Sequence, residues 1–363
     1  MRASSAYPQV SSRNYVKFVA VAIGLCFLFA FFADQPPVAP NMPGADYHLR
    51  GGEEGDGTAK LSDLIAVGLG LTEQASQAIR DVKAAGEEDL KVKGLTKEGV
   101  EEPVTVADTN SNNIFVNGYR NHFPGIHMLS EETEPERADT KLDNPTLPPG
   151  LVLETDHILD LSEVLIVVDP LDATREFGMD LLNYVTTMVC VVYKGVPIAG
   201  IINQVFEADK PPVVGVIPME GGKGVLFNRL KKASTCEPVG DAAHTVTLSM
   251  SHAGEGGTVV DKYLEGHTTL PAGGAGYKSL LVLDGMAEAY IHVTAIKSWD
   301  VCAADAVMKA SGGGFSDIEG KKLLYPMEYD SEKTQALFTN GIIAAASESQ
   351  QEFFVKKLDG HLS

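Results

Sequence analysis

The chain is short of cysteine, tryptophan and positive charge. Its 363 residues include four cysteines and one tryptophan, and 29 lysines and arginines stand against 49 aspartates and glutamates. The resulting formal charge of -20 repels the phosphate backbone of nucleic acid polymers, so binding to DNA or RNA is not expected. Glycine and proline are near ordinary usage, which excludes a collagen-like or wholly disordered chain. A hydrophobic content of 44% is enough for a substantial core.

No two of the cysteines form a C-x-x-C pair. Cys26 lies in an apolar N-terminal segment, Cys190 in a run typical of a core strand, and Cys302 in a stretch of helical composition. This spacing predicts neither a disulfide framework nor a zinc site. We expect all four cysteines, Cys236 included, to be structural or inert.

Charge is also absent from residues 18–33, which form an uninterrupted apolar run. A spanning helix takes about 20 residues, and Lys17 could lengthen the run because its stem can lie along apolar surface. Basic residues precede the run and acids follow it. The positive-inside rule therefore predicts a signal anchor, with residues 1–17 in the cytosol and the remainder in a lumen. The alternative is a cleaved secretory signal, although a cut after Ala33 would put bulky Phe31 at the minus-three position.

The anchor is followed by a segment that differs in composition from the rest. Residues 34–60 contain four prolines and several glycines and are predicted to form a flexible stalk. Residues 61–363 are predicted to form one lumenal domain. The short apolar run suits the thinner membranes of the early secretory route. No N-x-[ST] sequon with x other than proline occurs, so glycosylation sites add no support for a lumenal location.

Apolar periodicity divides the folded part into helices and strands. The spacing of apolar residues over 61–85 predicts an amphipathic helix, with Ser62 as a candidate N-cap. A second helix is predicted near 113–123. Two apolar runs, 184–193 and 198–206, flank a short Lys-Gly-Val-Pro turn and predict a β-hairpin.

Other segments extend the same pattern. Residues 133–160 are rich in proline, acids and threonine and predict an inserted surface loop. Asp300–Ala310 has helical composition and ends at a glycine run, and Trp299 just before it is expected to pack in the core. The alternation of elements implies a layered α/β architecture. Further strands are predicted at 165–168, 213–217, 224–228, 245–250 and 289–294.

Two carboxylates follow an apolar strand in the segment Asp169-Pro170-Leu171-Asp172-Ala173-Thr174. A single acid among 49 is usually a solvated surface charge, but acids directly after a buried strand are poorly placed for the surface. Strand ends are also where the sites of α/β sheets usually lie. Asp108, Glu131 and Asp300 are separated acids that the fold could bring to the same place. Hard divalent cations prefer such oxygen ligands, so the sequence predicts a site for cations and phosphate.

Three separated signatures, in the same order, resemble the inositol monophosphatase superfamily of magnesium-dependent, lithium-sensitive phosphomonoesterases. They are Ser130-Glu131-Glu132, the segment Asp169–Thr174, and Trp299-Asp300, and the resemblance covers roughly residues 61–345. Serine stands at position 130, where the superfamily has glycine. The resemblance implies a layered α-β-α-β-α sandwich of the inositol monophosphatase and fructose-1,6-bisphosphatase type.

The resemblance also implies metal ligands. Glu131 and Asp169 would bridge metals, and Leu171 would offer its backbone carbonyl. Asp172 and Asp300 would complete a second metal site. Two or three Mg²⁺ ions per site are implied, with inhibition by Li⁺ through competition at one of them.

The same segment would hold and attack the phosphate. By resemblance, backbone N–H groups near Ala173 and Thr174 would hold phosphate oxygens. The Thr174 hydroxyl, paired with Asp108, would orient and deprotonate the attacking water.

Four further segments carry a closer resemblance, namely Thr96–Gly99, Val185–Val191, Pro271–Lys278 and Tyr290–Thr294. They resemble one branch of the superfamily, the Golgi phosphatases of adenosine 3',5'-bisphosphate. The branch implies a single-pass type II Golgi membrane protein with a lumenal 3'(2'),5'-bisphosphate nucleotidase. Its reaction would convert the sulfotransferase by-product adenosine 3',5'-bisphosphate to AMP and orthophosphate.

Contacts to the nucleotide follow from the same branch. Ser249 and His252 would touch it, although Met250 replaces an arginine of the branch, and His252 could instead cap a helix. Lys278 is a candidate for the 5'-phosphate and could equally be a solvated lysine. The run Gly273-Gly274 lacks the ending of a Walker A loop and is interpreted as a turn.

Two other functions remain open. The first is hydrolysis of inositol mono- or polyphosphates, which would use the same metal site. The second is a membrane-tethered scaffold without activity, against which the intact set of acids argues. A homodimer is plausible for the superfamily.

Overall fold

The computed structural model describes residues 57–87, 89–95, 101–207, 209–228, 244–250, 253–329 and 336–358. The predicted cytosolic tail, the membrane anchor and most of the stalk lie outside these residues, as does His252. Within the described ranges, no helix is long and apolar enough to cross a membrane.

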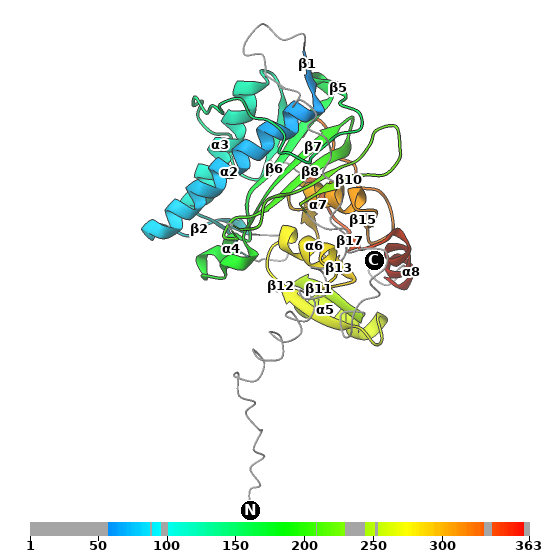
Figure 1. Cartoon of the computed structure of the whole chain (residues 1–363). Coiled ribbons are helices and arrows are strands. Elements are labelled where there is room, and N and C mark those ends of the chain that lie inside the picture. Colours follow the sequence, from blue (N-terminus) through cyan, green and yellow to red (C-terminus); the bar gives the residue numbers. More distant parts are fainter. Residues whose placement is uncertain are drawn as a thin grey trace, which may run out of the picture. The chain divides into compact units, whose positions relative to one another are not determined.

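A six-stranded sheet forms the first half of the framework (Figure 1). Its strand order is β10-β9-β8-β7-β6-β4, with β4 and β6 parallel and the other neighbours antiparallel. The strands are β4 (His127–Ser130), β6 (Val164–Asp172), β7 (Thr186–Tyr193), β8 (Val196–Gln204), β9 (Val213–Val216) and β10 (Val225–Phe227).

A five-stranded sheet forms the second half, in the order β12-β11-β13-β17-β15. β11 runs parallel to both β12 and β13, whereas β17 is antiparallel to its neighbours β13 and β15. The strands are β11 (Thr245–Ser249), β12 (Thr268–Ala272), β13 (Ala289–His292), β15 (Gly314–Asp317) and β17 (Ile342–Ala345). Three two-stranded pairs complete the set: β1 (Thr58–Lys60) with β5 (Ile158–Asp160), β2 (Lys91–Leu95) with β3 (Glu101–Val104), and β14 (Ile296–Lys297) with β16 (Leu337–Phe338).

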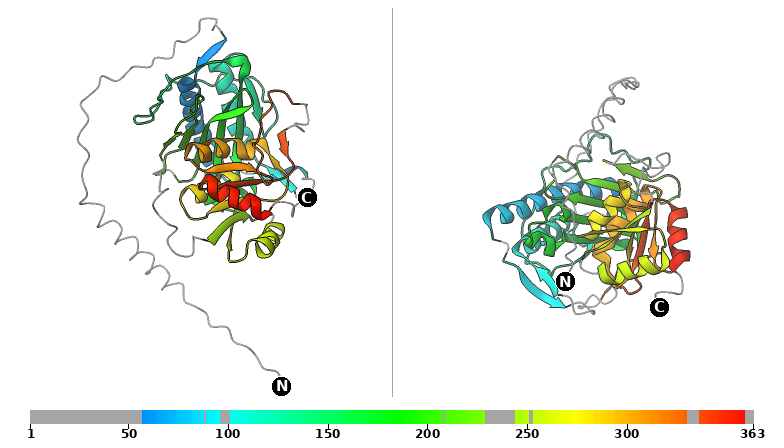
Figure 2. Two further views of the ribbon diagram at one scale, coloured as in Figure 1. Left: turned by 90° about the vertical axis from the view of Figure 1, so that its right-hand side faces the viewer. Right: turned by 90° about the horizontal axis from the view of Figure 1, so that it is seen from below.

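Helices lie between and outside the two sheets, which confirms the predicted α-β-α-β-α layers. α2 and α3 cover the outer face of the first sheet, α6 and α7 lie between the sheets, and α5 and α8 cover the outer face of the second. The right-hand view of Figure 2 shows these layers in succession from α2 to α8. The helices are α2 (Leu61–Ala85), α3 (Val106–His122), α4 (Thr174–Gly178), α5 (Ala253–Tyr263), α6 (Ala275–Leu283), α7 (Ser298–Ala310) and α8 (Glu348–Leu358).

The predicted hairpin is present as β7 and β8. Tyr193 pairs with Val196, and the two residues between them, Lys194 and Gly195, have φ angles of 53° and 78°. Positive φ at both central residues is the requirement of the tight turn that matches the twist of a hairpin. The hairpin was therefore predicted correctly from its two apolar runs and the turn between them.

Local differences from the predictions have identifiable causes. Ser62 does not cap α2, since its N–H and hydroxyl bond to Asp156 at 3.0 and 2.7 Å and so tie the helix start to the inserted loop. α3 starts at Val106, seven residues earlier than predicted, because Thr105 and Asp108 form a capping box there. The last residues assigned to the stalk, 58–60, form β1 and pair with β5.

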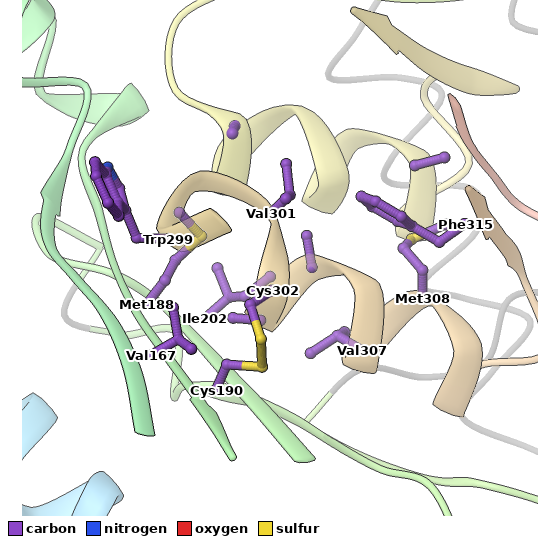
Figure 3. Close-up of a cluster of buried hydrophobic side chains, with 14 of the residues drawn as sticks. Val167, Met188, Cys190, Ile202, Trp299, Val301, Cys302, Val307, Met308 and Phe315 are labelled. Atoms are coloured by element: carbon purple, nitrogen blue, oxygen red, sulfur yellow. A yellow bond between two sulfur atoms is a disulfide. The ribbon is translucent and has the colours of Figure 1, made fainter. Parts of the chain in front are cut away.

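The prediction of no disulfide framework was wrong for one pair of cysteines. Cys190 of β7 and Cys302 of α7 are joined by a disulfide, and both are fully buried (Figure 3). They are 112 residues apart, so no short-range spacing signals the bond. Trp299 packs in the same cluster with an exposed fraction of 7%, as predicted. The disulfide links the first sheet to the helical layer that separates the two sheets.

Removing this link should lower the free energy of unfolding. Replacing both Cys190 and Cys302 with alanine is expected to cost roughly 2–5 kcal/mol in urea denaturation, because the bond closes a long loop in the unfolded chain. A reductant should destabilise the wild type and leave the double variant unchanged. Thiol titration of denatured residues 34–363 should find one free thiol, Cys236, before reduction; three free thiols would contradict the disulfide.

Candidate active site

Strand β6 places two acids, Asp169 and Asp172, at its C-terminal end. All nine of its residues are buried, and its pairing with β7 shifts register between Asp169 and Asp172. Such an irregularity re-aims side chains near functional sites. The next residue, Ala173, has φ 71°, in the left-handed region that few residues other than glycine adopt. This turn ends the strand and starts the short helix α4 at Thr174.

Two further acids reach the same place from other elements. The Glu131 N–H donates to the carbonyl of Val168 at 3.2 Å, so Glu131 follows β4 directly beside β6. Ser130, which replaces the expected glycine, is accommodated because its hydroxyl donates to Asn112 Oδ1 at 2.7 Å. Asp300 lies in the first turn of α7, where its Oδ2 accepts from a backbone N–H at 3.1 Å.

The convergence of these acids is visible in their electrostatics. Burial raises the pKa of Asp169 well above its ordinary value, and the charges of Glu131, Asp172 and Asp300 raise it further. Burial, followed by Glu131 and Asp172, raises the pKa of Asp300 to about 8. The fold therefore brings together the four carboxylates that the sequence predicted as metal ligands.

This group of carboxylates fits hard divalent cations. Its donors are all oxygens, and their mutual repulsion favours bound positive charge. Across the described residues, no three of these acids bring one oxygen each within 4.8 Å of one another. Such spacing suits cations that each take one or two carboxylates together with water, carbonyl and phosphate oxygens, which is how Mg²⁺ is usually held.

Lys93 of β2 is a member of the site that the sequence did not reveal. Its Nζ lies 2.6 Å from Glu131 Oε1 and 2.5 Å from Glu132 Oε1. Burial lowers the pKa of Lys93, but attraction to both glutamates outweighs it, so the net shift is upward. Lys93 therefore supplies a positive charge from the β2–β3 hairpin. Its segment carried no motif, only several charges and glycines.

Asp172 is seated on the N-terminus of α6. Its Oδ1 accepts from the Ala275 N–H at 3.1 Å, and its Oδ2 accepts from the Gly276 N–H at 2.8 Å and the Thr186 hydroxyl at 2.9 Å. A helix N-terminus favours a negative charge. A side chain at Gly276 would collide with Thr186, and one at Gly274 would meet Asp172 Oδ2 at 2.8 Å. The glycine-rich segment is thus a turn, as predicted, and it brings backbone donors close to a carboxylate.

Lys278 points inward from the same helix. Its Nζ donates to the carbonyl of Gly274 at 2.6 Å, and the residue is 3% exposed. Burial lowers its pKa to about 8, while the charges of Asp172, Glu176 and Asp300 raise it. The structure places Lys278 as a counter-charge among the acids and not as a solvated lysine.

Asp108 and Thr174 are joined across the site. The Thr174 hydroxyl lies 2.8 Å from Asp108 Oδ1 and 3.1 Å from the Leu171 carbonyl. Asp108 Oδ2 accepts from the N–H and hydroxyl of Thr105 at 2.8 and 2.5 Å. Burial raises the pKa of Asp108 to about 7; bonds from Thr105 and Thr174 oppose the rise, and the Glu131 charge adds to it. The predicted pair thus exists, and the capping box of α3 holds it in place.

Ser249, one of the residues predicted to contact the nucleotide, lies at the rim of the site, beside the glycine turn that seats Asp172. Ser249 ends β11 opposite Ala272 of β12, and the glycine turn follows directly after Ala272. The Met250 N–H donates to the Ala272 carbonyl at 3.1 Å, and its side chain is exposed. His252 lies outside the described residues, so its prediction stays untested.

Comparison with known proteins places the chain among its relatives. Residues 60–363 match the model of the inositol monophosphatase family. The chain belongs to the inositol monophosphatase family. It is 32% identical to inositol monophosphatase 3 of Danio rerio over 74% of this chain and 78% of the relative. It is 33% identical to the human Golgi-resident adenosine 3',5'-bisphosphate 3'-phosphatase over 74% of each chain.

Solved structures support the same fold. A lithium-soaked inhibitory complex of staphylococcal inositol monophosphatase-1 superposes with a TM-score of 0.55 and 16% sequence identity, covering 82% of this chain and 94% of that one. As a member of this family of phosphatases, the chain is a phosphoric monoester hydrolase. The converging acids are accordingly the candidate active site.

The role of the glycine turn in positioning Asp172 can be tested by adding a side chain to it. Gly276→Ala would push Thr186 and Met188 against the new Cβ and shift Asp172, so phosphatase activity should fall roughly 100-fold, the cost of about 1 Å of misplacement. The matched control is Gly257→Ala in α5, where a Cβ would meet nothing within 4 Å. Activity and circular dichroism should be measured for both. A folded Gly276→Ala enzyme with full activity would contradict this role of the turn.

Proposed function

We propose that the chain removes the 3'-phosphate of adenosine 3',5'-bisphosphate by adding water, giving AMP and orthophosphate. The observation that carries the phosphatase chemistry is the 2.8 Å contact between the Thr174 hydroxyl and Asp108, beside four converging carboxylates. A hydroxyl held by a buried carboxylate is an arrangement that can accept a proton from water.

Thr174 and Asp108 would together take a proton from the attacking water. Asp108 Oδ1 holds the Thr174 hydroxyl, so the threonine oxygen can accept a hydrogen bond from water while its own proton lies toward Asp108. Thr105 keeps the other carboxylate oxygen fixed. A pKa of about 7 puts Asp108 near the pH at which a general base works best. The water proton passes toward Asp108, and the oxygen attacks phosphorus as the bond to the ribose 3'-oxygen breaks. That ribose oxygen takes a proton from solvent water to become the 3'-hydroxyl of AMP, and Asp108 returns its proton to solvent.

The cation ligands are assigned as the sequence predicted. Glu131, Asp169, Asp172 and Asp300 would hold the ions with their carboxylates, and Leu171 would contribute its backbone carbonyl. Two or three Mg²⁺ ions would neutralise the phosphate and stabilise the attacking and leaving oxygens. Li⁺ would inhibit by competing for one of these places, and a staphylococcal inositol monophosphatase of the same fold is described as a lithium-soaked inhibitory complex.

The nucleotide part of the proposal rests on relatives and on position. A relative with 33% identity is named for adenosine 3',5'-bisphosphate. Backbone N–H groups of Ala173 and Thr174 would hold phosphate oxygens where α4 begins. Ser249 lies at the rim of the site, and His252 would join it in contacting the nucleotide. Lys278 would balance the charge of the acids around it and would not contact the 5'-phosphate, because its buried ammonium donates to the Gly274 carbonyl.

A lumenal location is supported by the disulfide. Disulfides persist in oxidising compartments and are rare in the cytosol, and the Cys190–Cys302 bond joins two core elements. Because a relative is named as Golgi-resident and residues 18–33 are apolar, we propose a single-pass type II Golgi membrane protein, with residues 1–17 cytosolic, 18–33 as anchor, 34–60 mostly as stalk and 61–363 lumenal. There it would clear a product of sulfotransferases. Whether it forms a homodimer stays a prediction.

Hydrolysis of inositol phosphates is the second candidate. Its support is the name of the Danio rerio relative, inositol monophosphatase 3, and the shared family. The cation site and the Asp108–Thr174 pair serve both substrates equally, so the choice lies with the residues at the rim.

The contribution of the Thr174 hydroxyl can be measured separately from that of the side-chain volume. Thr174→Val keeps the volume and removes the hydroxyl, so kcat should fall about 10²–10⁴-fold with little change in KM. Thr174→Ser restores a hydroxyl and should recover most of the activity. Steady-state kinetics on both variants decides the question; a serine variant as inactive as the valine variant would contradict the role of the hydroxyl.

The substrate proposal is tested by phosphate release from purified residues 34–363. With magnesium, adenosine 3',5'-bisphosphate should be hydrolysed to AMP faster than inositol 1-phosphate, a chelator should abolish release, and millimolar lithium should inhibit it. His252→Ala should slow hydrolysis of the nucleotide and spare that of inositol phosphate. The matched control is His127→Ala, an exposed histidine at the start of β4. Preference for inositol 1-phosphate would overturn the nucleotide assignment, and no release from either would overturn the phosphatase.

A further inference from the structure

Three potential metal ligands meet at the edge of the second sheet away from the active site. His244, His267 and Glu288 each stand immediately before a strand, namely β11, β12 and β13. These strands are adjacent and parallel, with Thr245 opposite Thr268 and Val246 opposite Ala289. The three residues therefore occupy neighbouring register positions at the starts of the strands.

The ligand atoms are close enough to share one ion. One nitrogen or oxygen from each of the three side chains lies within 4.8 Å of the others. His267 Nε2 and Glu288 Oε2 are 3.3 Å apart. Nitrogen and oxygen ligands at about 2.0–2.1 Å in a tetrahedron are separated by about 3.4 Å, so this pair already has the spacing of two ligands on one ion.

The orientation of His267 is fixed by its surroundings. Its Nδ1 lies 3.2 Å from the Leu264 carbonyl, so the N–H belongs on Nδ1 and the lone pair on Nε2. The ring also contacts Phe353 and Phe354 of α8, with ring centres at 6.1 and 5.6 Å. A second hydrogen bond that orients the ring is a usual feature of a metal-binding histidine.

In this orientation two hydrogen-bond acceptors face each other. With its proton on Nδ1, His267 presents a lone pair to the Glu288 carboxylate, and neither atom has a hydrogen to donate. A metal ion between them would be bound by both atoms. His244 adds a second imidazole beside the same pair, which completes a set of three ligands for one metal ion. Its ring meets that of His267 edge-on, with centres at 5.6 Å.

We propose that His244, His267 and Glu288 bind one borderline divalent cation of the Zn²⁺ class, with water as the fourth ligand. Two imidazoles and a carboxylate are a donor set typical of zinc, whereas the all-oxygen active site suits magnesium. The cysteine spacing predicted no zinc site, and this one uses no cysteine. The ion would join the starts of three strands and so stabilise the second sheet.

The position separates this site from catalysis. The active-site rim lies at the other ends of the same strands, at Ser249 of β11 and after Ala272 of β12. Five residues of strand span roughly 15 Å. The proposed ion is thus too distant to touch the substrate phosphate, and its loss should leave the magnesium-dependent reaction intact.

The test is zinc binding by the purified full-length chain with magnesium in excess, measured by competition with a chromogenic chelator. Wild type should bind one zinc more than His244→Ala, whose affinity at this site should fall by at least the roughly 10–100-fold that loss of an orienting group costs. Glu288→Gln should behave alike. His244 is exposed, so its variant should fold, and His127→Ala is the matched control.

Zinc should also raise the Tm of wild type and of His127→Ala but not of His244→Ala, and phosphatase activity of the zinc-free proteins should be equal in all three. Zinc held by the catalytic carboxylates would be common to every variant and cancels in the comparison. Equal zinc binding by wild type and His244→Ala, or no zinc binding by either, would overturn the proposal.

Discussion

Mutual repulsion between buried carboxylates is the constraint around which this structure is arranged. Asp169, Asp172 and Asp300 come from two elements, and burial together with their shared charge raises the pKa of Asp169 and Asp300. The fold opposes this repulsion with Lys93, with Lys278 and with the N-terminus of α6. The negative charge that these groups do not neutralise favours the binding of divalent cations. Bound cations in turn attract phosphate.

The geometry of the acids depends on contacts between layers. α7 packs on β6, β7, β8 and β9 while it also contacts β15 and β17 of the other sheet. It carries Asp300 in its first turn and the disulfide to β7 two residues later. Figure 3 shows this helix, with Trp299, Cys302 and Val307, against the strands of the first sheet. The position of Asp300 relative to Asp169 is therefore set by core packing, not by either segment alone.

Strands β11 and β12 of the second sheet lie between the candidate active site at one end and the proposed zinc site at the other. At the ends of β11 and β12, the glycine turn offers backbone N–H groups to a carboxylate. At the starts of the same strands, two imidazoles and a glutamate face one another. Parallel neighbours make this possible, because residues at equal positions in adjacent parallel strands meet at one edge. The all-oxygen ligands from β6 and α7 at one end of these strands, and a set with two imidazoles at the other end, would keep the two ions apart.

Several elements and the chemistry of the main motif can be predicted from the sequence. Apolar runs, helical spacing and turn residues predict strands, helices and the β7–β8 hairpin, and the segment Asp169–Thr174 predicts a cation and phosphate site, because these signals lie within a few residues of one another. The role of Lys93, the inward ammonium of Lys278, the pairing of Cys190 with Cys302 and the contact of His244 with its partners are visible only in the folded chain. Those contacts join residues distant in sequence, and packing between layers, which no local pattern encodes, selects which of them meet.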